Sequence, residues 1–229
     1  MIRERIGADR AARVHVISTG VDVSGIRALT AVDPRAAEGW PSDALIVGSL
    51  GRLAPEKSPG VLFDAVALAA ASVPSLRLLV VGGGPSEPDL RVRAALPDLA
   101  GRASLTGTLP RPEALTRIAG ADLFCFTSQT ETQGLVLAEA LSAGLPAVAV
   151  DGPGVRDSVR DGVDGVIVSA DPADSLVPRL AAAVAELAAD QARRSAMGER
   201  ARSDADRFAV ERRVSEIEAL YREVGGGGA

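Results

Sequence analysis

Two positively charged side chains stand close together in a short loop that follows a run of apolar residues. The apolar run covers 44–50, and the loop after it, from Gly51 to Lys57, also carries Arg52 and Glu56. Glycine lets a ligand approach the backbone closely, and two cations from one loop can neutralise a diphosphate without a metal ion. Lys57 is the only lysine of the chain, which favours a position that needs a compact point charge. A solvated loop with an exposed Glu56–Lys57 pair explains these residues about equally well.

A second candidate site lies at the predicted start of a helix. The stretch TETQGLVLAEA at 130–140 follows the apolar run 122–126. The backbone N–H groups around Gly134, Leu135 and Val136 have no acceptor inside such a helix, and the glycine leaves room for a phosphate to approach. This end of the helix is therefore expected to bind an anion.

Two glutamates flank this helix start, and their positions predict different roles. Glu139 lies four residues after Leu135, on nearly the same helix face and roughly 6 Å further along the axis. Its carboxylate can accept hydrogen bonds from the two hydroxyls of a ribose, whereas beside the phosphates it would repel them. Glu131 precedes the helix and is expected to face a sugar on the other side of the diphosphate. The alternative is that Glu131 is an acid favoured by the helix dipole and Glu139 an exposed helical residue. The helical neighbours of Glu139 are apolar, and a charge there is costly without a partner, which favours the binding role.

These loops need a framework that brings them together. Short apolar runs alternate with longer amphipathic segments, which predicts an α/β fold: a Rossmann-like, doubly wound parallel sheet with helices on both faces. The expected strands are 44–50, 76–81, 103–105, 122–126, 146–150 and 165–168. The expected helices are 60–72, 87–96, 111–118, 134–143, 173–189 and later segments to about Val224. Such sheets bind ligands outside the carboxyl ends of their strands, where both candidate loops fall.

The first forty residues fit this domain less well. Residues 1–13 are expected to form a short charged helix, 14–17 a strand and 18–40 a linker with turn residues. The chain is therefore divided into residues 1–40, the end of a preceding domain and its linker, residues 41–224, the ligand-binding domain, and residues 225–229, a flexible glycine-rich tail.

Composition and charge exclude several classes of function. The net charge of −5 argues against nucleic acid as a partner, and without an apolar signal or membrane-spanning run we expect a soluble chain. A single cysteine allows no internal disulfide, which favours the reducing cytoplasm. Cys125, the only cysteine, lies in an apolar run and is expected to be a buried structural thiol. His15 is the only histidine, so no histidine-based triad or zinc cluster can form. Asp204 and Asp206 have the spacing of metal ligands but stand in a charged helical stretch, so we predict no metal site.

Taken together, the motifs resemble the retaining glycosyltransferases of the large family 4, which have the two Rossmann-like domains of the GT-B fold. The resemblance covers nearly the whole chain. It rests on Ser18-Thr19-Gly20-Val21-Asp22, Gly51-Arg52-Leu53 with Glu56-Lys57, Val81-Gly82-Gly83-Gly84-Pro85, Thr106-Gly107, and Glu131 paired with Glu139. Two positions depart from the family: Ser18-Thr19 replaces the usual Pro-Asn, and Gly83 replaces an acid found in many members. Neither departure removes a charge that the site requires.

The resemblance implies that the chain is the carboxy-terminal, donor-binding half of such an enzyme. Arg52 and Lys57 would hold the diphosphate, and with Glu131 they are the residues expected to carry catalysis. Glu139 would bind the ribose and the backbone near Leu109 the base. The remaining residues expected to contact the nucleotide sugar are Gly51, Gln133, Gly134, Leu135 and Val136.

The resemblance also implies partners. The variant Glu131-Thr132-Gln133-Gly134 is similar to a subset of bacterial enzymes that glycosylate lipids and small acceptors, some from UDP-glucose, so a UDP-sugar is favoured over a GDP-sugar. No cofactor is expected. The acceptor pocket would belong to the preceding domain, through which the enzyme would also touch the inner face of the membrane, and turnover is expected only with that domain present.

Two other functions stay open at this point. A nucleotide-sugar epimerase or phosphorylase can use the same scaffold, since fold alone does not fix the reaction, and an acidic base in the preceding domain would favour it. A non-catalytic nucleotide-sugar sensor or activating subunit is the third, favoured if a separate chain supplies the amino-terminal domain.

Overall fold

A six-stranded, all-parallel sheet forms the centre of the chain in a computed structural model that describes residues 14–226. Its strands are β1 (Leu45–Leu50), β2 (Leu76–Val81), β3 (Ala103–Leu105), β4 (Leu123–Phe126), β5 (Ala147–Val150) and β6 (Gly165–Val168). They lie in the order β3-β2-β1-β4-β5-β6, with every neighbouring pair parallel. This is the strand order of a doubly wound Rossmann sheet. The predicted fold class is confirmed, and each strand begins and ends within one residue of its expected bounds.

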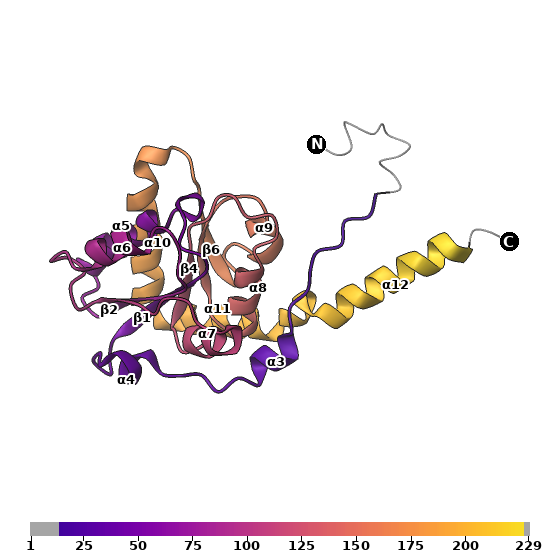
Figure 1. Cartoon of the computed structure of the whole chain (residues 1–229), viewed down its shortest axis with the longest axis horizontal. Coiled ribbons are helices and arrows are strands. Elements are labelled where there is room, and N and C mark those ends of the chain that lie inside the picture. Colours follow the sequence, from indigo (N-terminus) through magenta and orange to yellow (C-terminus); the bar gives the residue numbers. More distant parts are fainter. Residues whose placement is uncertain (1–13, 227–229) are drawn as a thin grey trace.

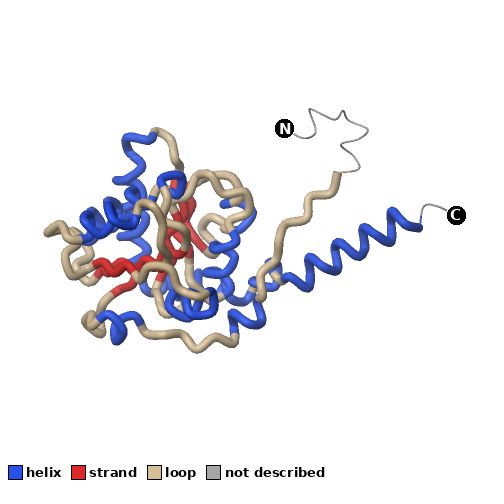
Figure 2. The backbone as a smooth tube through the Cα atoms, in the orientation of Figure 1, coloured by secondary structure: helices blue, strands red, loops and turns tan. Residues whose placement is uncertain are grey.

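Helices cover both faces of the sheet (Figures 1 and 2). On one face α5 (Pro59–Ala70) and α10 (Leu176–Ala189) pack against each other over Leu78, Val80 and Val148. On the other face α7 (Arg111–Ile118) and α8 (Leu135–Ser142) pack over Ile46 and Phe124. The remaining helical segments are α3 (Val23–Arg27), α4 (Pro34–Glu38), η1 (Pro55–Lys57), α6 (Glu87–Ala94), α9 (Val155–Ser158), η2 (Ala173–Ser175), α11 (Gln191–Ser203), η3 (Ala205–Phe208) and α12 (Val210–Gly226).

The strands and helices follow from how the apolar residues are spaced. The central strands β1, β2, β4 and β5 are buried along almost their whole length, because helices shield both faces of the sheet, so they consist of nearly unbroken apolar runs. In α10 the buried positions Leu176, Leu180, Val184 and Leu187 recur at helical spacing and form one stripe towards the core.

Several expectations for the chain ends are wrong. Residues 14–17 were expected to form a strand, but they lie outside the sheet and Val16 is exposed. A strand needs a hydrogen-bonded neighbour, and none of the described strands pairs with this segment. The expected linker 18–40 contains two short helices, α3 and α4, capped by the side chains of Asp22 and Asp33. Helix α9 was not expected, and α12 continues through Gly226, so residues 225 and 226 belong to a helix and not to the expected tail. The helix expected at 1–13 and residues 227–229 lie outside the described residues.

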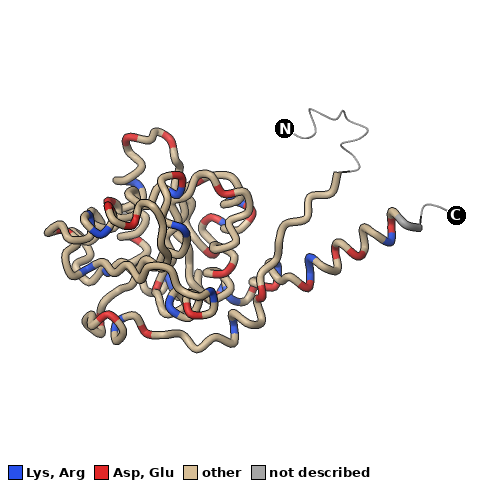
Figure 3. Tube along the Cα trace, in the orientation of Figure 1, with Lys and Arg blue, Asp and Glu red and all other residues tan. Residues whose placement is uncertain are grey.

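The two ends of the described chain leave the body side by side. Val21 forms an isolated bridge with Ala209: its N–H donates to Phe208 O at 2.9 Å, and its carbonyl accepts from Val210 N at 3.0 Å. From this point residues 14–20 and α12 both extend away from the sheet (Figure 1). Acidic and basic residues are interspersed over the body and along α12 (Figure 3). Between residues 14 and 226 no helix is long and apolar enough to span a bilayer.

A buried carboxylate joins the loop before β6 to η3. Asp164 is fully buried and accepts hydrogen bonds from the backbone N and the Nε of Arg160, both at 2.7 Å, and from Nη2 of Arg207 at 2.8 Å. Two guanidinium groups thus neutralise one carboxylate that has no access to water.

Candidate active site

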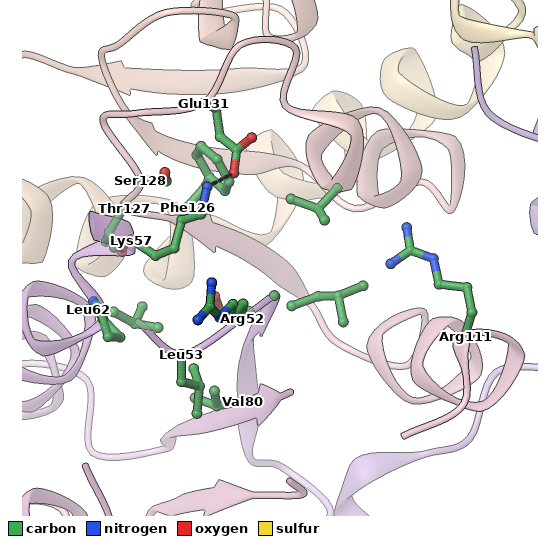
Figure 4. A pocket seen from close by; sticks show the side chains of 15 residues that line it. Arg52, Leu53, Lys57, Leu62, Val80, Arg111, Phe126, Thr127, Ser128 and Glu131 are labelled. Carbon is green, nitrogen blue, oxygen red and sulfur yellow. Dashed lines mark hydrogen bonds and ion pairs between the residues drawn. The ribbon is translucent and has the colours of Figure 1, made fainter. Parts of the chain in front are cut away.

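A cavity of about 330 Å³ opens at the carboxyl ends of β1 and β4 (Figure 4). Between these two strands the order of the sheet reverses, which is where doubly wound sheets bind ligands. The loop after β1 contributes Gly51, Arg52 and Lys57 to the wall, and the loop after β4 contributes Glu131. The two loops singled out in the sequence therefore meet at one cavity.

Lys57 and Glu131 form an ion pair across this cavity. The ammonium group of Lys57 donates to Oε1 of Glu131, and the two side chains are only 28% and 26% exposed (Figure 4). Two hydrogen bonds hold the loops in this arrangement: Thr127 Oγ1 donates to the carbonyl of Lys57 at 3.0 Å, and Thr130 Oγ1 donates to that of Glu56 at 3.1 Å. The alternative of an exposed Glu56–Lys57 pair is therefore wrong.

Arg52 is the more open of the two cations. Its side chain is 69% exposed, and its guanidinium lies 3.9 Å from the carboxylate of Glu56. It lines the 330 Å³ cavity and also a second one, described below. Because its ion pair with Glu56 is long and both groups face water, Arg52 is free to reorient towards an anion.

The start of α8 presents backbone N–H groups beside these cations. Gly134 stands at the N-cap in the left-handed conformation, with φ 61°, and its carbonyl accepts from Leu137 N at 2.8 Å. Leu135 and Val136 are the first two residues of the helix, so their N–H groups have no acceptor within it. Val136 also lines the cavity, which brings the positive end of the helix dipole to the Lys57–Glu131 pair.

Gln133 does not belong to the wall of the cavity. Its Oε1 accepts a hydrogen bond from the backbone N of Thr19 at 3.2 Å, so the side chain joins the loop before α8 to the segment that leads into α3. Gly134 and Leu135 also lie outside the lining residues.

Glu139 is buried within the apolar helix α8. It is 7% exposed, so the alternative of an ordinary exposed helical residue is wrong. Its Oε1 accepts from Nη2 of Arg111, the first residue of α7. Its Oε2 is buried and has no hydrogen-bond partner among residues 14–226. Glu139 is not itself a lining residue, but Arg111 lines the cavity in front of it.

A second cavity of about 480 Å³ adjoins the first and contains the predicted position Leu109. The two share Leu50, Gly51, Arg52 and Arg111. The glycines after β2 allow the surrounding loops to approach: a Cβ at Gly82, where φ is 135°, would stand 1.9 Å from the carbonyl oxygen of Gly51. The cavities thus form one continuous lining from the end of β2 to Glu131.

Sequence reasoning missed several polar side chains of this lining, among them Arg111 and Ser128. Arg111 stands between two prolines at the start of a helix, and that pattern indicates the helix but not the direction of the side chain. Ser128 is buried, lines the first cavity, and its Oγ has no partner among the described residues (Figure 4). It follows the end of β4 directly, and doubly wound sheets bind ligands at the carboxyl ends of their strands, so its position was a signal that could have found it.

Cys125, Asp204 and Asp206, for which the sequence predicted no catalytic or metal-binding role, are buried or form ion pairs outside the two cavities. Cys125 is fully buried in β4, and this burial raises the pKa of its thiol to about 12, so the structural interpretation is confirmed. Asp204 pairs with Arg160 at 2.8 Å and Asp206 with Arg27 at 2.6 Å. In the described part of the chain, no three His, Cys, Asp or Glu side chains are grouped so that they could hold a metal ion.

Residues 33–204 match the family model of glycosyl transferases group 1. The chain belongs to this family. It is 33% identical over 221 residues to a D-inositol 3-phosphate glycosyltransferase of Thermobispora bispora, a match that covers 92% of this chain and 50% of that enzyme. It is 39% identical over 171 residues to one of Mycobacterium tuberculosis, with 71% and 34% covered. The chain thus spans half or less of the length of these curated relatives.

Solved glycosyltransferases share the fold of this group 1 domain. Anabaena Alr3699/HepE, in a crystal structure with UDP, superposes with a TM-score of 0.78 at 23% identity, over 91% of this chain and 57% of that one. Sucrose-phosphate synthase from Thermosynechococcus elongatus superposes with a TM-score of 0.77 at 23% identity, over 93% and 53%. The Rossmann-like sheet is therefore that of GT-B glycosyltransferases. The segment matched by the group 1 model includes both cavities and all ten predicted site residues.

Proposed function

We propose that the chain binds a nucleoside-diphosphate sugar across the two adjoining cavities and forms the donor half of a retaining hexosyltransferase. The observation that carries this proposal is the Lys57–Glu131 ion pair beside the start of α8, at the switch point of the sheet. The ammonium group of Lys57 and the backbone N–H groups at the start of α8 suit a diphosphate. The carboxylate of Glu131, which is paired with Lys57, suits the hydroxyls of the attached sugar.

The diphosphate is assigned to Arg52, Lys57 and the N–H groups of Leu135 and Val136, with the backbone of Gly51 close by. Glycosyl transfer leaves negative charge on the departing diphosphate, and oriented donors stabilise that charge most strongly where water is excluded. Since two cations and a helix start supply this stabilisation, the proposal includes no metal ion and no cofactor.

The nucleoside and the sugar are assigned to opposite sides of the diphosphate. Glu139 carries a buried Oε2 without a partner among residues 14–226, which suits a ribose hydroxyl. The backbone at Leu109 lies in the cavity beyond Arg111, where the base would sit. Glu131 then faces the donor sugar, next to the loop that Gln133 holds.

The relatives favour UDP and a glucose-like hexose. Anabaena Alr3699/HepE is described in crystal structures with UDP, with UDP and glucose, and with UDP-glucose. The curated relatives are named as glycosyltransferases of D-inositol 3-phosphate, which favours a small polar acceptor for this chain as well, although a lipid or glycan acceptor fits the donor half equally. Because the chain spans half or less of those relatives, the acceptor pocket and turnover are assigned to a preceding domain.

Calorimetric titration of the chain with UDP, GDP and ADP tests this function. We expect UDP to bind most tightly and Glu139→Ala and Lys57→Ala each to weaken it. Arg93→Ala is the matched control, because Arg93 pairs with Asp64 and Asp98 and borders neither cavity. If none of the three nucleotides binds, the proposed function is refuted. If UDP binds and neither variant weakens it, the nucleotide occupies another site.

A further inference from the structure

Arg111 lies where the two cavities meet. It is the first residue of α7, and its guanidinium reaches across to Glu139 in α8. The side chain is 49% exposed, whereas the carboxylate it contacts is only 9% exposed. It borders the first cavity from the side opposite Lys57 (Figure 4). A ligand that fills both cavities must therefore pass along this guanidinium.

The pair between Arg111 and Glu139 leaves polar capacity unused on both partners. Glu139 accepts through Oε1 only, and its Oε2 is buried without a partner among the described residues. A buried acceptor of this kind is costly unless a donor reaches it. The guanidinium carries five N–H groups, and only Nη2 donates to a described residue, while the rest of the head is open to the cavities.

A purely structural role would not require this arrangement. An arginine that only neutralises a buried carboxylate is expected to engage both oxygens side by side, because that geometry is the strongest for the pair. Here a single oxygen is engaged, so the carboxylate is held in place while its buried second oxygen has no donor among the described residues. An O–H donor that reaches this oxygen would satisfy it.

We propose that Arg111 is a positioning residue for ribose: it fixes the Glu139 carboxylate so that Oε2 accepts from a ribose hydroxyl, while its remaining N–H groups donate to the same nucleotide. The inference rests on the proposed function, because it takes the ligand to be a nucleoside diphosphate. Arg111 then contributes to selectivity for ribonucleotides over deoxyribonucleotides. Removing it lets the carboxylate turn, so affinity and selectivity fall together.

The test compares UDP with 2′-deoxy-UDP and 3′-deoxy-UDP by calorimetry on the 229-residue chain and its variants. For the unaltered chain we expect the loss of at least one ribose hydroxyl to weaken binding about tenfold, because a hydrogen bond to a charged group is lost. In Arg111→Ala we expect UDP itself to bind about tenfold more weakly and the penalty for either deoxynucleotide to fall below about threefold. Arg111→Lys keeps the positive charge but loses the planar array of N–H donors. Compared with Arg111→Ala, it should recover part of the UDP affinity and a smaller part of the discrimination between UDP and the deoxynucleotides.

Two comparisons separate this inference from its alternatives. Arg93→Ala, the control used for the proposed function, must leave both affinity and discrimination unchanged. If Arg111→Ala unfolds at ordinary temperature, Arg111→Lys and Arg111→Gln carry the test, with the loss of discrimination expected to be full in Arg111→Gln and partial in Arg111→Lys.

The outcomes also separate the inference from the proposed function. If UDP does not bind the unaltered chain, both are refuted. If UDP binds, and the Arg111 variants lower affinity without changing the ribose-to-deoxyribose ratio, Arg111 is only structural and this inference is refuted while the proposed function stands. If Arg111→Ala strengthens UDP binding, the guanidinium blocks the ribose site, and the inference is again refuted.

Discussion

Replacing Lys57 with alanine tests the centre of the proposed donor site, because it removes the only lysine of the chain and leaves Glu131 without its cation. Both side chains are about three-quarters buried, so the proposed contact of Lys57 with a diphosphate would be a hydrogen bond between charged groups in a partly desolvated place. Such a bond contributes about 1.5 to 3 kcal/mol net. At about 1.4 kcal/mol for each factor of ten, UDP affinity should fall roughly 10- to 150-fold.

Arg52 provides the internal comparison. Its side chain is 69% exposed, and exposed ion pairs contribute only about 0.2 to 1 kcal/mol. Arg52→Ala should therefore weaken UDP by less than about sixfold, although both cations belong to the same loop. The order Lys57 before Arg52 follows from burial alone.

A second substitution separates lost attraction from added repulsion. In Lys57→Ala the Glu131 carboxylate keeps its charge and faces the diphosphate unpaired. Adding Glu131→Gln removes that charge, so the double variant should bind UDP several-fold more tightly than Lys57→Ala alone, a departure from additivity expected of groups in contact. The recovery should shrink as salt is raised, since part of the repulsion is screened.

The assay is calorimetric titration with UDP at about 0.15 M and about 0.5 M salt, with thermal unfolding of each variant as a check of the fold. The reasoning is refuted if folded Lys57→Ala binds UDP within twofold of the unaltered chain. It is equally refuted if Arg52→Ala costs more than Lys57→Ala, because burial would then not set the ranking.

Three further predictions concern other parts of the molecule. Asp164→Ala leaves the guanidinium groups of Arg160 and Arg207 without their buried partner and should lower the free energy of unfolding in urea by about 3 kcal/mol; a loss below about 1 kcal/mol would contradict this role. Ser128→Ala should weaken UDP a few-fold with little change in unfolding midpoint, because its Oγ bonds to no described residue; equal affinity would show that the hydroxyl does not reach the ligand. The native pKa of about 12 for Cys125 exceeds the ordinary 9.0, so the associated stability is complete below pH 9 and is lost as pH rises towards 12. A thiol reagent at pH 8 should therefore modify Cys125 only when the chain unfolds, and rapid labelling of native protein would contradict its burial.

The sheet could be predicted from the sequence because its strands are buried on both faces. Each central strand is then a short unbroken apolar run, which is a local signal, and β2, β3 and β6 match their expected bounds at both ends. The apolar run 14–17 carries the same signal, but a strand also needs a partner, and pairing is not local. Helices α3, α4 and α9 have five residues or fewer, too short for a helical period to be visible, although Asp33-Pro34 is a recognisable start.

The site could be predicted in part, for a topological reason. Lys57 and Glu131 follow β1 and β4, and in a doubly wound sheet these strands are neighbours although 74 residues separate the two side chains. Their meeting could therefore be inferred from the strand order alone. The sequence also indicated that Glu139 needs a partner, but not which arginine supplies it. That depends on where α7 begins, which is set by the loop after β3.

The ion pairs Lys57–Glu131 and Arg111–Glu139 follow the same physical logic, and the proposed function assigns them to different parts of a donor. Glu131 and Glu139 each give one oxygen to a cation, Lys57 or Arg111, which makes a desolvated carboxylate tolerable without using its whole acceptor capacity. Each carboxylate is then left with acceptor capacity for a hydroxyl group. Every ribonucleoside diphosphate carries the ribose assigned to Glu139, whereas only a nucleotide sugar carries the hexose assigned to Glu131. Loss of the Glu139 charge should therefore weaken UDP and UDP-glucose alike, while loss of the Glu131 charge releases Lys57 to the diphosphate and penalises only UDP-glucose.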